Sequence, residues 1–150
     1  MNTIRIQSED LLAEVTALLD ELAACTDSPG AGVTRLLYSD AWRQGQDYLA
    51  RRMEEAGLDV RYDNVGNLFG RLPGRSADER TVLTGSHVDT VRSGGKFDGA
   101  YGIAAGIAAV AYLRRRYGQP LRPLEVVSFC EEEGSRFPIA YWGSGHVTGA

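Results

Sequence analysis

Two short runs of apolar and β-branched residues enclose a long helical segment, and this arrangement restricts the fold more than any other feature of the chain. Residues 81–85 and 124–129 have the composition of strands, and residues 99–117 between them predict one long helix. A crossover of this β-α-β kind is right-handed in nearly all proteins and sets its two strands parallel. The sequence therefore predicts an α/β fold built on a partly parallel sheet.

The residues before this unit predict two amphipathic helices. The first helix begins near Ser8. Apolar residues that recur at helical spacing mark its inward face: Leu11, Leu12, Val15, Leu18, Leu19 and Leu22. The second is expected from Ser39 to Gly57, with an inner side formed by Trp42, Leu49 and Met53. Both helices are expected to be structural.

A β-hairpin is expected between the second helix and the β-α-β unit. Residues 58–62 and 67–72 have strand character, and they flank a turn at residues 63–66 that contains aspartate, asparagine and glycine. A loop at residues 73–80 then leads to the first strand of the β-α-β unit. An antiparallel hairpin beside a parallel pair would give a mixed sheet.

Composition limits the class of protein. The 150 residues are 43% hydrophobic, include five prolines and carry a formal net charge of -4, which is typical of one globular domain over residues 1–150. With a pI near 5.2 and scattered arginines, the chain has no basic face for nucleic acid. Residues 100–113 are too short to span a bilayer, and no signal peptide is evident, so we expect a cytoplasmic protein without a membrane partner.

The chain has two cysteines, Cys25 and Cys130, which is too few for a disulfide framework, and we expect both thiols to be free.

Side chains that bind metals or transfer protons follow both strands of the β-α-β unit. His87 and Asp89 come after the first strand, Asp98 stands before the crossover helix, and a run of glutamates, 131–133, follows the second strand. Because parallel strands end at the same edge of a sheet, these groups can converge in one pocket. Adjacent carboxylates repel one another, and a divalent cation is one of the few partners that offsets such charge density. The sequence therefore predicts half of a two-metal hydrolase site.

The spacing of these residues suggests separate roles. Asp98 is suited to bridge two metals about 3.5 Å apart, the separation used by two-metal hydrolytic sites. Asp89, two residues after His87, is placed to accept the second N–H of the imidazole and so fix its tautomer. At the turn after a strand, two successive carboxylates can serve one pocket, one on a metal and one on water.

Five blocks of the chain resemble, in order, those of one enzyme family; the blocks are residues 34–39, 63–68, 85–91, 94–99 and 132–137. The family is the amidohydrolase branch of the dinuclear zinc metallopeptidase-like superfamily. It holds allantoate amidohydrolases, N-carbamoyl-L-amino-acid hydrolases, ureidoglycolate amidohydrolases and β-alanine synthases. The resemblance implies an α/β/α catalytic domain of zinc-peptidase type with a mixed sheet, two divalent ions (zinc or manganese) and a small-molecule ureido substrate.

The resemblance also implies a role for each matching residue. It places His87 on one metal, Glu133 on the other and Asp98 between the two, with Glu132 as the general base that activates the attacking water. It further implies a cis peptide bond between Asp98 and Gly99. The implied reaction is hydrolysis of a ureido or carbamoyl C–N bond, with allantoate as the substrate and N-carbamoyl-L-amino acids or ureidoglycolate as alternatives.

Family members are far longer, take one more histidine per metal from later in the chain, and bind substrate through a separate lid and dimerisation domain. We therefore expect residues 1–150 to be the N-terminal part of a metallohydrolase catalytic domain from a homodimeric enzyme, and we expect the activity to belong to that longer enzyme and not to residues 1–150 alone. The alternative is a non-catalytic module that binds metal weakly and associates through an uncovered sheet edge. Three further residues are expected to have no role: Glu131 as a solvated loop residue, Cys130 as an inward-packed thiol and His146 as a loop residue.

Overall fold

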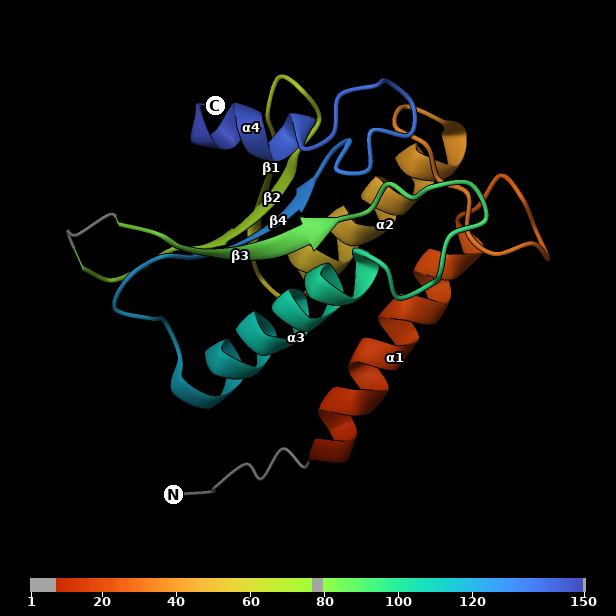
Figure 1. Cartoon of the computed structure of the whole chain (residues 1–150). Coiled ribbons are helices and arrows are strands. Elements are labelled where there is room, and N and C mark those ends of the chain that lie inside the picture. The colour runs from red at the N-terminus through yellow and green to blue at the C-terminus, as the bar shows by residue number, and fades with distance from the viewer. Residues whose placement is uncertain (1–7, 77–79, 150) are drawn as a thin grey trace.

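A four-stranded mixed sheet forms the centre of the described chain, residues 8–76 and 80–149 of the computed structural model (Figure 1). In the spatial order β1-β2-β4-β3, its strands are β1 (Asp59–Tyr62), β2 (Leu68–Leu72), β4 (Leu124–Phe129) and β3 (Val82–His87). β2 pairs antiparallel with both β1 and β4, whereas β3 and β4 run parallel. The predicted hairpin, parallel pair and α/β class are confirmed.

Two helices cover one face of this sheet, and a third packs against one of them. The helices of the described residues are α1 (Ser8–Ala24), α2 (Asp40–Glu55), α3 (Ala100–Tyr117) and the short α4 (Trp142–Thr148). Gly70 of β2 and Val126 of β4 are neighbours in register and face the same way. Gly70 lies against Met53 of α2, and Val126 lies against Gly106 of α3, so both helices cover the same face. α1 packs alongside α3 (Figure 1).

The two predicted N-terminal helices form much as expected. Ser39 caps α2 by accepting the Trp42 N–H at 3.2 Å, and Trp42, Leu49 and Met53 are all buried. In α1 the leucines of the last turns, Leu18, Leu19 and Leu22, are buried as predicted. Leu12 was expected on the same face but is 68% exposed, because the stripe that packs runs along one side of α1 and Leu12 falls on its solvent side.

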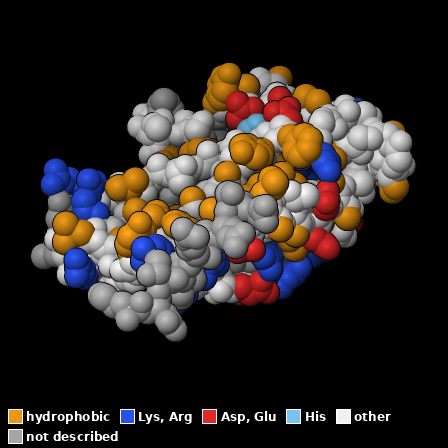
Figure 2. All heavy atoms as spheres, turned by 90° about the horizontal axis from the view of Figure 1, so that it is seen from below, with side chains coloured by type: hydrophobic (Ala, Val, Ile, Leu, Met, Phe, Trp, Pro, Cys, Tyr) orange, Lys and Arg blue, Asp and Glu red, His pale blue; other side chains and the backbone are white. Residues whose placement is uncertain are grey.

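β3 forms one edge of the sheet and carries exposed hydrophobic side chains. Val82 and Leu83 are exposed at its start, as are Tyr101 and Leu113 of the neighbouring α3. Figure 2 shows hydrophobic side chains spread between charged ones over the face seen from below. Across residues 8–76 and 80–149, every helix is too short or too polar to cross a membrane.

Candidate metal centre

His87 is the last residue of β3, so its buried ring stands at the edge where the parallel strands end. Its Nδ1 lies 2.9 Å from the backbone oxygen of Asp89. When Nδ1 carries the proton and donates it to this carbonyl, the lone pair of the imidazole is on Nε2. Nε2 lies 3.6 Å from Oε2 of Glu132. The histidine is therefore oriented with its ligand nitrogen toward the glutamates.

Three residues bring ligand atoms together at this edge. Among the described residues, the group able to hold a metal ion consists of His87, Glu132 and Glu133, whose ligand atoms all lie within 4.8 Å of one another. Figure 2 shows acidic side chains on either side of a histidine at the upper end of the face it views. One imidazole nitrogen and two carboxylates are ligand types that zinc and manganese both accept. The residues present therefore fit a divalent cation.

The loop after β4 is closed by its own backbone, which fixes the position of the glutamates. The N–H groups of residues 141–143 donate to the carbonyls of residues 130–132 at 2.9 to 3.2 Å. Burial raises the pKa of Glu133; the nearby His87 opposes this rise, and the negative charges of Asp98 and Glu132 add to it. A bound cation would offset the repulsion between these neighbouring carboxylates.

Asp89 supports the site through different atoms from those predicted. Its backbone oxygen accepts the hydrogen bond of His87, while its Oδ1 lies 3.8 Å from the same nitrogen. The carboxylate instead accepts the backbone N–H of Glu133 at 3.2 Å, with a further backbone hydrogen bond from Glu132. Burial raises the pKa of Asp89, and these hydrogen bonds oppose the rise. Asp89 thus joins the end of β3 to the glutamate loop.

Asp98 lies close to this group without being part of it. Its side chain is exposed at the turn before α3, and its charge contributes to the raised pKa of Glu133. A bridging role for Asp98 stays a prediction. The predicted cis bond after it is wrong, because all described peptide bonds are trans. The chain turns instead at Gly99, which adopts φ +62° and ψ -53°.

Arg35, which the sequence analysis did not single out, anchors the segment that follows β3. Its side chain is 1% exposed, and burial lowers its pKa to about 10. The guanidinium donates to the backbone oxygens of Leu22 at 2.5 Å and Cys25 at 3.1 Å, and its Nε donates to that of Val88 at 2.6 Å. Arg35 therefore ties the C-terminal end of α1 to the residue before Asp89. The only sequence signal is an arginine among apolar neighbours.

Asn67 is a second buried residue that sequence reasoning missed. Its Nδ2 donates to Oδ2 of Asp63 at 2.7 Å and to the backbone oxygen of Gly143 at 2.9 Å. Its Oδ1 accepts the backbone N–H of Cys130 at 2.8 Å. These bonds join the hairpin turn, the end of β4 and α4. Asn67 thereby fixes the start of the glutamate loop.

The three residues expected to have no role differ in outcome. Cys130 is buried and its thiol lies 3.1 Å from the backbone oxygen of Val65, so inward packing is confirmed, and both cysteines are free as predicted. The expectation of a solvated Glu131 is wrong, because its carboxylate accepts the N–H groups of Arg136 and Phe137 and becomes buried inside the loop. His146 lies on α4 rather than in a loop and is exposed, outside the candidate metal group.

Comparison with known proteins places the chain in a family. Residues 67–148, more than half of the chain, match the model of peptidase family M28. The chain belongs to this family. Allantoate amidohydrolase of Bacillus subtilis is 50% identical to this M28 chain over 135 residues, which are 90% of the chain and 33% of that protein. Ureidoglycolate hydrolase of Oryza sativa subsp. japonica is 45% identical over 132 residues, 88% of the chain and 27% of that protein.

Solved structures support the same placement of this M28 chain. A crystal structure of a hydantoinase/carbamoylase family amidase from Burkholderia ambifaria matches with a TM-score of 0.86 and 42% identity, covering 91% of the chain and 34% of that structure. The resemblance to the amidohydrolase branch and the α/β fold are thereby confirmed. The M28 chain spans about a third of the length of the relatives it matches.

Proposed function

We propose that this M28 chain carries metal ligands of an amidohydrolase that cleaves a ureido or carbamoyl C–N bond. The observation that carries this proposal is the group formed by His87, Glu132 and Glu133 at the sheet edge. The names of the relatives support the choice of bond, because allantoate and ureidoglycolate are both ureido compounds. Allantoate is the first substrate to test, since the 50% identity is to an allantoate amidohydrolase.

The proposal assigns the ligands as the family resemblance does. His87 through Nε2 and Glu133 would hold one ion each, with Asp98 between two divalent ions, zinc or manganese. When bound, such ions act as Lewis acids toward a carbonyl oxygen and lower the pKa of water. Asp89 keeps Glu132 and Glu133 side by side through its hydrogen bonds to their backbone N–H groups.

Glu132 is the proposed general base. Its side chain is 32% exposed, so water reaches it, and its Oε2 faces His87 Nε2 at 3.6 Å. In the proposed reaction Glu132 takes a proton from the water that attacks the ureido carbonyl, and then gives that proton to the departing nitrogen. The carbamate released from allantoate would decompose to ammonia and carbon dioxide.

An ammonia-release assay tests this function. The assay is run on the chain alone and on the longer enzyme proposed to contain it, each supplied with manganese or zinc chloride and with allantoate, ureidoglycolate or an N-carbamoyl-L-amino acid. We expect allantoate to give the largest kcat/KM, and Glu132→Gln to lower kcat by about 10²-fold or more. Glu54→Gln, on the exposed side of α2, is the matched control and should leave kcat unchanged. Equal rates for Glu132→Gln and the control would contradict the assignment of the base.

The same assay distinguishes the alternatives. Faster ammonia release from ureidoglycolate or from an N-carbamoyl-L-amino acid would identify that compound, and not allantoate, as the substrate. Metal binding without release from any of the three would favour the non-catalytic alternative, for which the exposed Val82 and Leu83 on the free edge of β3 are the supporting observation. Light scattering tests the proposed homodimer, and cell fractionation tests the proposed cytoplasmic location.

A further inference from the structure

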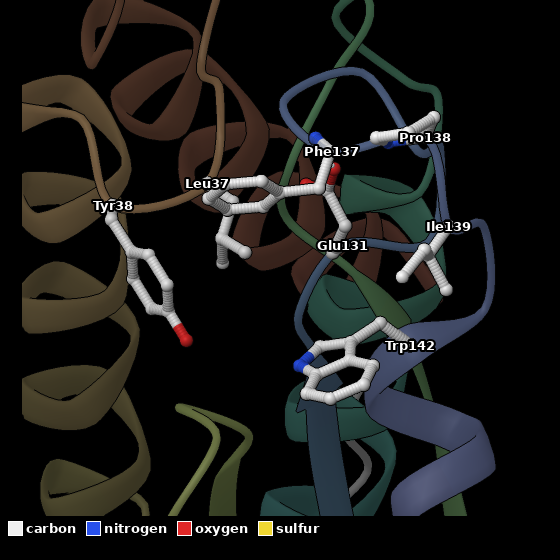
Figure 3. A pocket seen from close by; sticks show the side chains of 7 residues that line it. All are labelled: Leu37, Tyr38, Glu131, Phe137, Pro138, Ile139 and Trp142. Atoms are coloured by element: carbon white, nitrogen blue, oxygen red, sulfur yellow. Dashed lines mark hydrogen bonds between the residues drawn. The ribbon is translucent and has the colours of Figure 1, made fainter.

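A cavity of about 290 Å³ lies beside the glutamate loop, on the side of α4 and of the segment that leads into α2 (Figure 3). Three aromatic residues and two aliphatic ones form most of its wall: Tyr38, Phe137, Trp142, Leu37 and Ile139. This volume is close to the lower end of the range found for small-molecule sites. None of the described residues that line the cavity is basic.

Glu131 supplies the charged group of this cavity. Its side chain is 1% exposed and forms part of the cavity wall. Oε1 accepts the N–H groups of Arg136 and Phe137 at 2.9 and 2.7 Å. Oε2 is buried and has no hydrogen-bond partner among the described residues. A buried carboxylate oxygen without a donor is unfavourable, so a ligand that brings a donor to Oε2 would relieve that cost.

The surroundings favour a positive charge on that donor. Burial raises the pKa of the Tyr38 hydroxyl, and Cys130 and the negative charges of Asp63 and Glu131 add to the rise, so two carboxylates lie near a cavity that no described basic side chain lines. Aromatic faces attract organic cations through their electron-rich rings. Figure 3 shows the indole nitrogen of Trp142 and the hydroxyl of Tyr38 turned toward the space between them. The Tyr38 hydroxyl already donates to the Val65 carbonyl at 2.9 Å.

We propose that this cavity binds a small organic cation, an ammonium or guanidinium group on a flat apolar body. Its N–H groups pair with Oε2 of Glu131, and its body packs between the rings of Tyr38, Phe137 and Trp142. Glu131 is 1% exposed, so binding requires the Phe137 side chain, which is 46% exposed and also lines the cavity, to move. The site lies outside the group of His87, Glu132 and Glu133, and the proposal does not rest on the proposed hydrolase activity.

Titration of the full chain with benzylammonium chloride, followed by ¹H–¹⁵N NMR, tests the proposal. Benzyl alcohol, which has the same ring without the charge, is the matched neutral probe. We expect the cation to bind about tenfold more tightly than the alcohol, because its donor meets a charged acceptor. The indole N–H signal of Trp142, which lines the cavity, should shift on addition of the cation.

Variants separate this site from the metal group. Glu131→Gln keeps an oxygen for the N–H groups of Arg136 and Phe137 and removes the charge, so its affinity for the cation should fall to that of the alcohol. Glu133→Gln should bind the cation as the unaltered chain does. If Glu131→Gln does not fold, Trp142→Ala takes its place, with an expected loss of about fivefold. Equal affinity for cation and alcohol, or a loss of binding in Glu133→Gln, would overturn the proposal.

Discussion

Replacing Gly99 by alanine tests whether the turn into α3 is fitted around His87. A Cβ at Gly99 would lie 2.5 Å from the backbone oxygen and from Cε1 of His87, and contacts below 3.0 Å force atoms to move. The positive φ of Gly99 adds about 1–3 kcal/mol for a residue with a side chain. Overpacking adds about 1–3 kcal/mol more. We expect a loss of about 2–6 kcal/mol from a free energy of unfolding of about 5–15 kcal/mol.

Urea denaturation followed by circular dichroism measures this loss. Gly95→Ala is the matched control, because a Cβ at Gly95 in the same loop has nothing within 4 Å. We expect the free energy of unfolding of this control to change by less than about 0.5 kcal/mol. If Gly99→Ala and Gly95→Ala unfold at the same urea concentration, the turn is not fitted around His87 and the reasoning is wrong.

Three further predictions concern the buried supports of the site. Arg35→Met removes donors to three backbone oxygens and should lower the free energy of unfolding by about 2–4 kcal/mol in urea, whereas the exposed Arg43→Met should change it by less than about 0.5 kcal/mol. Asn67→Ala leaves the buried N–H of Cys130 without its partner and should cost about 2–3 kcal/mol in thermal unfolding; an unchanged Tm would contradict this role. Burial raises the pKa of Cys130 to about 12, so its thiol is neutral at pH 8, and iodoacetamide should label Cys25 first, as measured by peptide mass spectrometry; equal rates would refute the burial.

The parts of the fold that follow from local pattern could be predicted from the sequence. The β-α-β unit and the hairpin depend on residue spacing and turn residues, and both form with the expected pairing. The convergence of His87 with Glu132 and Glu133 follows from parallel strands that end at one edge. Leu12 was misplaced because helical spacing gives the width of an apolar stripe but not which side of it meets a neighbour.

The parts that depend on loop closure could not be predicted. Glu131 is buried because the loop folds back and brings two N–H groups to its carboxylate. Arg35 is satisfied by carbonyls from α1 and from the end of β3, which no local pattern reveals. The expected cis bond came from the resemblance alone, and a glycine with positive φ makes the turn at Gly99 instead.

Calorimetric titration with zinc and with manganese tests the central claim most directly, because it measures the metal site without requiring turnover. We expect the chain to bind at least one ion, Glu133→Gln to weaken binding by about tenfold or more, and the exposed Glu54→Gln to leave it unchanged. Binding of two ions would support the bridging role of Asp98. Absence of binding, or equal affinity in Glu133→Gln and the unaltered chain, would contradict a metal centre held by His87 and Glu133 beside Glu132.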